Sequence, residues 1–307
     1  MPLNTQAVTT YYGAIEAGGT KFNCAFGNNH DSILEQVRIP TTTPAETKAL
    51  VEIFFDHCIQ KYAPMTAIGV ACFGPVDLDP NSKTYGSIIQ TPKPNWSNTP
   101  ITAWLADKYN VPVGFDLDVN GAALGEIKYG AGNGLHSMCY VTIGTGIGVG
   151  VVANGQTLNG LLHPEFGHIA LHKIAGEADG ICESHGNCAA GLASGPAIQH
   201  RWGAPAETFE DGHPMWSSQA HYIAAFCNAI TLAYSPQRIV LGGGVMQFSS
   251  LLAKVQQAFA QEVNGFLPVL ERTGGVEQYI VSPGLNTASG VAGAFIIAQA
   301  QASKLIT

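Results

Sequence analysis

Four potential metal ligands follow a carboxylate near the middle of the chain. They are His168, Cys182, His185 and Cys188, and Glu165 precedes them in the run Glu-Phe-Gly-His. The last three ligands lie at three-residue steps, so a tight loop can bring two thiolates and two imidazoles around one Zn²⁺. The loop is polar, which argues against the two cysteines serving only as small core residues. The spacing therefore predicts a zinc site beside a carboxylate.

This zinc is expected to be structural. Four protein ligands leave no open coordination position, so the ion would not act as a Lewis acid. His163 and His172 lie close to the predicted ligands in sequence and stay open as alternative ligands.

Two glycine turns in matching positions could bind phosphate groups. Each is predicted to join two strands, and glycine lets backbone N–H groups approach an anion with no Cβ in the way. A single turn of this kind is usually only a hairpin, but the matched pair favours a nucleotide site. The candidate residues are Gly18, Gly19, Thr20 and Lys21 in the first turn and Gly144, Thr145 and Gly146 in the second.

Neither turn matches the two common nucleotide motifs. Gly19-Thr20 stands where a P-loop has Lys-Ser/Thr, and the second turn lacks the spacing and the helix of a dinucleotide fold. A third cluster, 242–244, is expected to end a buried strand and open a helix, where bare backbone can pass close to a ring or ribose. Its members are Gly242, Gly243 and Gly244, and a plain strand-to-helix turn remains an equal alternative.

The elements that must carry these residues alternate between strands and helices, which favours parallel sheets. Strands are expected at 12–17, 22–26, 33–39, 67–72, 111–116, 138–143, 147–153, 238–241 and 279–281, and helices at 44–62, from 99, and at 119–129, 191–201, 217–234, 251–264 and 287–303. The pattern restarts in mid-chain, so two similarly wound halves are expected. The last helix is expected to return to the first half, giving domains of 1–118 plus 289–307 and of 119–288.

Composition excludes several classes of protein. A net charge of −8 with only 14 Lys and Arg disfavours a nucleic-acid partner. The first ten residues do not resemble a signal peptide, and no apolar run is long enough to span a membrane, so a cytoplasmic protein without a membrane partner is expected. Five of the seven cysteines lie in apolar segments, as reduced core thiols do; they are Cys24, Cys58, Cys72, Cys139 and Cys227.

The hairpin turns, the triple glycine and the Glu-x-Gly-His element together resemble the ROK sugar kinases of the actin-like ATPase superfamily. The resemblance covers nearly the whole chain, and its most specific part is 141–148 followed by Gly160 and 165–168. It implies an α/β, actin-like (ribonuclease H-like) fold with two similar βββαβαβα domains around a cleft.

Within that family the chain looks most like the bacterial zinc-containing fructokinases. The segments that carry this likeness are 16–21, 73–77, 91–93, 115–123 and the Cys-x-x-His-x-x-Cys loop. The resemblance implies ATP-dependent phosphorylation of D-fructose to D-fructose 6-phosphate, Mg²⁺ bound with ATP, and a homodimer. Most members begin the first phosphate turn with Asp, so Glu16 is a departure that leaves its role toward Mg²⁺ open.

The resemblance also assigns roles to single residues. Phosphoryl transfer needs aligned oxygens, charge neutralisation and one proton acceptor, and Asp118 matches the family's general base. A carboxylate at the start of a helix could instead serve only as a helix cap, and Asp116 could fill that role. His168 could bind zinc through one ring nitrogen and offer the other to a sugar hydroxyl. The predicted sugar contacts are Gly74, Asn95, Asn120, Glu165 and His168, whereas Lys93 and Trp96 could simply lie on the surface.

Other functions remain as alternatives. Glucose, mannose or an N-acetylhexosamine could replace fructose, because hydroxyl discrimination depends on positions that a sequence does not supply. A sugar-sensing regulator would be expected to lose the base or the phosphate turns, and the chain keeps both. A ROK repressor would need an N-terminal helix-turn-helix, and only about ten residues precede the first expected strand.

Overall fold

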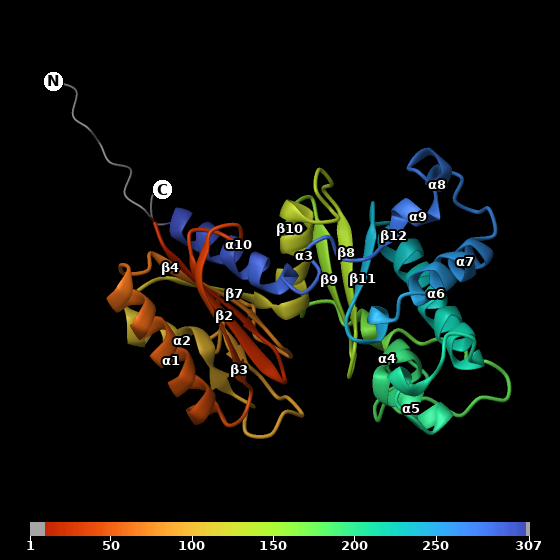
Figure 1. Ribbon diagram of the computed structural model, residues 1–307, viewed down its shortest axis with the longest axis horizontal. Helices are drawn as coiled ribbons and strands as arrows, with labels where there is room; N and C mark the ends of the chain where they lie inside the picture. Colours follow the sequence, from red (N-terminus) through yellow and green to blue (C-terminus); the bar gives the residue numbers. More distant parts are fainter. Residues whose placement is uncertain (1–9, 305–307) are drawn as a thin grey trace. The chain divides into compact units, whose positions relative to one another are not determined.

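The computed structural model describes residues 10–304, which form two compact units (Figure 1). The first contains the described residues up to Gly125 and from Ala288 onward, and the second spans Glu126–Thr287. The domain limits predicted from the sequence, 1–118 with 289–307 and 119–288, stay a prediction. The expectation about a signal peptide falls almost wholly on residues outside the described part.

The first unit is built on a five-stranded mixed sheet with the order β3-β2-β1-β4-β7. Its strands are β1 (Tyr12–Ala17), β2 (Lys21–Gly27), β3 (Ile33–Pro40), β4 (Ala67–Cys72) and β7 (Val113–Leu117). The first three are antiparallel neighbours, whereas β1, β4 and β7 are parallel. The carboxyl ends of these three parallel strands therefore lie at the same edge of the sheet.

Four helices complete the first unit, with α3 running across the division between the units. They are α1 (Pro44–Lys61), α2 (Ile101–Tyr109), α3 (Asp118–Tyr129) and α10 (Ser289–Ser303). Helix α1 begins with a capping box in which Thr43 and Glu46 bind each other's backbone N–H. Helix α10 packs against β1 and β4 (Figure 1). The expected helix start at Thr99 is wrong, because 99–100 form strand β6 (Thr99–Pro100), paired with β5 (Ser87–Ile88).

For Trp96, the alternative of a surface position is excluded, because its indole ring is completely buried. The ring packs against Phe22 and Phe73, with centroid separations of 5.4 and 5.7 Å. Its Nε1 donates to the carbonyl of Thr42 at 2.8 Å, so the indole satisfies its one polar group inside the core.

The second unit repeats this sheet topology with the order β10-β9-β8-β11-β12. Its strands are β8 (Met138–Ile143), β9 (Ile147–Ala153), β10 (Gln156–Thr157), β11 (Ile239–Gly242) and β12 (Ile280–Val281). Again an antiparallel meander adjoins three parallel strands. The predicted mixed α/β architecture with two similarly wound halves is confirmed.

The helices of the second unit differ from expectation at several points, and the short helices at 269–272 and 276–279 were not expected. Its helical segments are η1 (Phe166–His168), α4 (Ala189–Ala193), α5 (Gly195–Trp202), η2 (Ala206–Thr208), α6 (Pro214–Tyr234), η3 (Val245–Gln247), α7 (Leu251–Val263), α8 (Val269–Arg272) and α9 (Val276–Tyr279). The single helix expected at 191–201 is two helices, because Ser194 is extended and caps α5. The triple glycine opens the 3₁₀ turn η3 rather than an α-helix.

The five cysteines in apolar segments are buried, as expected of core residues. Within residues 10–304, no helix has both the length and the apolar character needed to cross a membrane.

Candidate functional site

Three predicted site residues follow the parallel strands of the first unit at one sheet edge. Gly18 comes just after β1, Gly74 just after β4, and Asp118 directly after β7. Ligands of open α/β sheets bind beyond the carboxyl ends of the strands. This unit therefore gathers a glycine turn and a carboxylate at the edge where a ligand is expected.

Asp118 is the first residue of α3 and is partly buried. Its Oδ1 accepts the N–H of Val119 at 2.8 Å. Burial raises the pKa of Cys72 well above its usual value, and the negative charge of Asp118 raises it further. The carboxylate is thus near the end of β4, at the N-terminal end of a helix, where negative charge is stabilised.

Asp116 and Asn120 form a buried pair beside it. Asp116 Oδ1 accepts the N–H of Leu117 and the amide of Asn120, both at 2.7 Å. Asn120 is completely buried, and its Oδ1 has no hydrogen-bond partner within the described residues. Its amide nitrogen is bound to Asp116, so the amide oxygen is the end of Asn120 that could accept a hydrogen bond from a ligand.

The loop after β5 positions two more predicted sugar contacts. Thr91 Oγ1 donates to the carbonyl of Gly74 at 3.4 Å, which ties the loop to the end of β4. Asn95 is exposed with φ of 68° in a turn closed by the N–H of Trp96 and the carbonyl of Lys93. Asparagine tolerates this left-handed backbone, so the turn alone explains Asn95, and its sugar contact stays a prediction.

The first glycine turn has one glycine that the fold requires and one that it does not. Gly18 donates its N–H to the carbonyl of Lys21 at 2.9 Å, and a Cβ on Gly18 would lie 2.9 Å from that same oxygen. Thr41 Oγ1 fixes the turn by donating to the Gly18 carbonyl. A Cβ on Gly19 would meet no atom within 4 Å, and Thr20 is exposed.

Glu16 is held by two residues that the sequence analysis did not single out. Its Oε2 accepts the amide of Asn23 from the neighbouring strand at 2.7 Å. A Cβ on Gly290 of α10 would lie 2.5 Å from the Glu16 carboxyl carbon, so a larger residue there would displace the end of this side chain. Burial raises the pKa of Glu16, against the opposing effects of Asn23 and Lys21. The register of β1 and β2 could have suggested Asn23, whereas no local signal marks Gly290.

The second glycine turn also leaves open space. No atom lies within 4 Å of a Cβ built on Gly144 or Gly146. The Gly144 N–H donates to the carbonyl of Gly146 at 2.9 Å, and the Gly144 carbonyl accepts the N–H of Gly195 at 2.7 Å. The start of α5 therefore supports this turn. Thr145, at its tip, is exposed.

The triple glycine is mainly required by packing. Gly243 has φ of +92°, and a Cβ there would lie 2.4 Å from the backbone of Ile143. A Cβ on Gly242 would lie 2.5 Å from the Tyr140 hydroxyl, whereas one on Gly244 would be in open space. Two of the three predicted nucleotide-binding glycines thus have a structural explanation that the sequence did not reveal.

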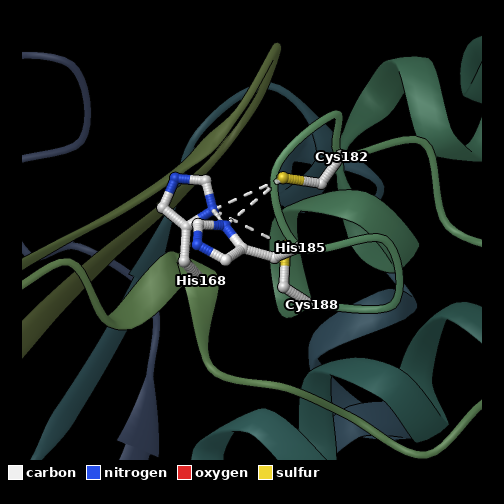
Figure 2. A group of neighbouring side chains, drawn as sticks. All are labelled: His168, Cys182, His185 and Cys188. Atoms are coloured by element: carbon white, nitrogen blue, oxygen red, sulfur yellow. Dashed lines mark hydrogen bonds between the residues drawn. The ribbon is translucent and has the colours of Figure 1, made fainter.

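The four predicted metal ligands lie together in the second unit (Figure 2). All four ligand atoms are within 4.8 Å of one another, and both histidines present Nδ1 to the group. The Nδ1 atoms of His168 and His185 are 3.2 Å apart, and His168 Nδ1 is 3.7 Å from Cys182 Sγ and 3.6 Å from Cys188 Sγ.

These separations fit a tetrahedral zinc site. Zinc bond lengths place two coordinating nitrogens about 3.3 Å apart and a nitrogen and a sulfur about 3.6 Å apart. Cys188 also caps α4, since its Sγ accepts the N–H of Gly191 at 3.3 Å. The cluster could therefore hold a metal ion, and His168 coordinating through Nδ1 would leave its Nε2 for another partner.

The two alternative histidines are not in the cluster. The His163 side chain is only 2% exposed, and its Nδ1 lies 3.4 Å from the carboxylate of Glu165. His172 is exposed. Glu165 itself precedes η1, and its carbonyl accepts the N–H of His168, so the two predicted sugar contacts lie one 3₁₀ turn apart.

The fold and these sites define a two-unit α/β protein with paired glycine turns, and known proteins identify its family. The model of the ROK family matches residues 12–301, so the chain belongs to the ROK family. A fructokinase from Zymomonas mobilis is 41% identical over 298 residues, which cover 95% of this chain and 98% of that protein. A fructokinase from Streptococcus mutans is 41% identical over 277 residues, covering 89% and 91% of the two chains.

A solved structure supports the fold. The ROK hexokinase of Thermus thermophilus superposes with a TM-score of 0.77 at 24% identity, covering 96% of this chain and 100% of that one. The chain has the actin-like ATPase fold of the ROK sugar kinases, as predicted.

Proposed function

We propose that this protein is a fructokinase, which transfers the γ-phosphoryl group of ATP to the 6-hydroxyl of D-fructose. The observation that carries the proposal is the identity of 37–41% with several fructokinases over 89–97% of this chain. The match to the family model, over residues 12–301, includes both glycine turns, Asp118 and the metal cluster.

Asp118 is proposed as the general base. As the sugar oxygen forms its bond to the γ-phosphorus and the bond to the leaving ADP oxygen breaks, the carboxylate accepts the hydroxyl proton. Its position at the start of α3, one residue beyond a strand, suits this role because the rigid strand end fixes the carboxylate. Mg²⁺ bound with ATP would neutralise phosphate charge. The carboxylate closest in sequence to the first turn is that of Glu16, whose role toward Mg²⁺ stays open.

The glycine turns are proposed to bind the phosphates of ATP. At four of these glycines, a Cβ would lie in open space among the described residues. They are Gly19, Gly144, Gly146 and Gly244. Packing does not require glycine at these positions. The close approach of a phosphate to backbone that lacks a Cβ would explain why glycine is present there. Lys21, partly buried beside the first turn, would add a positive charge.

The sugar is proposed to contact Glu165 and the Nε2 of His168, with Asn120, Gly74 and Asn95 as further contacts. Glu165 is 46% exposed, so its carboxylate can reach a ligand. We propose Zn²⁺ as the ion of the metal cluster, where two thiolates and two imidazoles form a closed tetrahedral set that braces His168. A homodimer in the cytoplasm completes the proposal.

A coupled assay of ADP release across a panel of hexoses tests this function. Fructose is expected to give the highest kcat/KM. A higher value for glucose, mannose or an N-acetylhexosamine would reassign the substrate within the family. If no hexose stimulates ADP release, the proposed kinase activity would be wrong and a sugar-sensing regulator would be favoured instead.

A further inference from the structure

The segment that connects the first two metal ligands is anchored to two helices through Glu177, which lies between His168 and Cys182. Residues 169–181 contain no helix or strand, yet Glu177 in this segment is only 16% exposed. Its carboxylate Oε2 lies 3.0 Å from the Nη1 of Arg201 on α5, whose side chain is 2% exposed. A loop without regular structure thus contributes its carboxylate to an ion pair that is largely buried.

Helix α6 supplies the remaining partners of this carboxylate. Ser218 Oγ donates to Glu177 Oε1 at 2.5 Å, and Tyr222 Oη donates to Oε2 at 2.8 Å. The Tyr222 hydroxyl also accepts the N–H of Ile174 at 3.0 Å, so the loop backbone is bound as well as its side chain. We call Glu177, Arg201, Ser218, Gln219 and Tyr222 the Glu177 clamp.

The clamp also reaches the helix that follows the last metal ligand. Arg201 Nη2 donates to Gln219 Oε1 at 3.3 Å, and the guanidinium lies 4.6 Å from the Tyr222 ring centroid. Gln219 Nε2 in turn donates to the carbonyl of Ala193 at 2.6 Å. Ala193 ends α4, whose cap is Cys188. One largely buried network therefore holds both the segment before Cys182 and the helix after Cys188.

We propose that Glu177 and Arg201 are positioning residues for the metal cluster, which keep the ligands in their binding arrangement and slow the release of zinc. The inference rests on the zinc site proposed above. A buried pair is poorly screened, and removing one partner leaves an uncompensated charge, so its loss frees the loop. Partners that orient metal ligands typically change metal affinity by 10–100-fold when removed.

The same segment contains a matched control. Lys173 Nζ and Asp179 Oδ1 form an ion pair at 2.6 Å, but their side chains are 30% and 80% exposed. Exposed pairs contribute little. Asp179→Asn therefore removes a carboxylate from the same loop without touching the clamp.

The experiment measures zinc content by mass spectrometry and the rate of zinc release to a chromogenic chelator, neither of which depends on catalysis. Wild-type protein is expected to carry one zinc ion per chain. Glu177→Gln is expected to release it at least ~10-fold faster, and Asp179→Asn at the wild-type rate. Should Glu177→Gln fail to fold, Ser218→Ala, which removes one hydrogen bond to Glu177, is expected to release zinc faster than Asp179→Asn.

A second control separates positioning from general loosening. Val255 is completely buried in α7 of the same unit, outside the clamp, so Val255→Ala lowers stability by creating a cavity. Its zinc release is expected to stay at the wild-type rate. Equal release rates for wild type and Glu177→Gln, or equal acceleration in Val255→Ala, would overturn the inference. Zinc-free wild-type protein from zinc-supplemented cells would instead overturn the zinc site, whereas the fructokinase assay stands independently of both outcomes.

Discussion

The two sheets of this protein share a strand order but carry different chemistry. In both, an antiparallel meander of three strands adjoins two further parallel strands, and a glycine turn joins the first two strands. In the first unit, a helix that directly follows the last strand carries Asp118. In the second, the long segment after β10 carries Glu165 and the metal ligands. The shared topology supplies the turns, and local additions supply the base and the metal site.

The glycines of the two units fall into two groups, according to whether a Cβ at the position would meet other protein atoms. The turns of both units contain glycines whose Cβ positions are open, namely Gly19 in the first and Gly144 and Gly146 in the second. Gly243, by contrast, is needed because the backbone of Ile143 in the same unit lies against it. Glycine is therefore present for two different reasons, which are access for a ligand and close packing within the protein. Substitution by alanine can separate them.

The largest expected effect is on the base of the first unit. Asp118→Asn removes the proton acceptor but keeps the side-chain shape, so kcat is expected to fall by at least ~100-fold with little change in KM for fructose or ATP. Steady-state kinetics measure both. Asp79→Asn, an exposed change in the same unit, is the control. Near wild-type turnover in Asp118→Asn would remove Asp118 from the mechanism.

The next effect belongs to the metal site of the second unit. Cys182→Ser removes one thiolate, so zinc is expected to be lost and KM for fructose to rise by about 10-fold or more, because His168 loses its orientation. KM for ATP is expected to stay within about twofold. Full fructose affinity in protein shown to be metal-free would contradict the link between zinc and the sugar.

The glycine comparison gives a smaller, two-sided effect. Gly19→Ala and Gly146→Ala are expected to raise KM for ATP several-fold without changing Tm, because a Cβ obstructs a phosphate but no protein atom. Gly243→Ala is expected to lower Tm, since alanine is strained at φ of +92° and meets Ile143. Loss of stability in Gly19→Ala or Gly146→Ala would show that these glycines also serve the fold.

The smallest effect is a pH-dependent change in stability at Glu16. Its raised pKa means that the folded state holds the proton more tightly than the unfolded state. The stabilising contribution is therefore complete below pH 4.5, the unfolded value, and is lost as pH rises through the folded pKa. Glu16→Gln is expected to raise Tm at pH 7 and to leave it nearly unchanged below pH 4.5, while impairing turnover.

Glu46 is the control of opposite sign. Hydrogen bonds from Thr42 and Thr43 lower the pKa of this exposed carboxyl, so its contribution is present above pH 4.5 and is lost as pH falls through the folded pKa. Glu46→Gln is expected to lower Tm slightly at pH 7. Thermal unfolding of both variants across pH tests the pair, and a lowered Tm for Glu16→Gln at pH 7 would contradict the sign for Glu16.

Much of this molecule could be predicted from its sequence where the signal is local. Strand and turn residues marked the two hairpins, and the three-residue steps of Cys182, His185 and Cys188 marked the metal cluster. What could not be predicted depends on contacts between distant segments. Trp96 packs against Phe22 and Phe73, and Gly290 lies against the end of the Glu16 side chain.

The Glu177 clamp is the clearest case of a distant arrangement. Its residues come from a loop and two helices, and neither their spacing nor their types distinguish them from surface residues. A local contact was also missed. Asp116 and Asn120 lie four positions apart and were both singled out from the sequence, but the hydrogen bond between them was not predicted.

This protein is expected to transfer a phosphoryl group from ATP to a sugar hydroxyl. Phosphorus NMR of ATP and D-fructose incubated with the wild-type protein tests it most directly. A fructose 6-phosphate signal that grows in step with ADP is expected. Growth of ADP together with inorganic phosphate, and without any sugar phosphate, would contradict it.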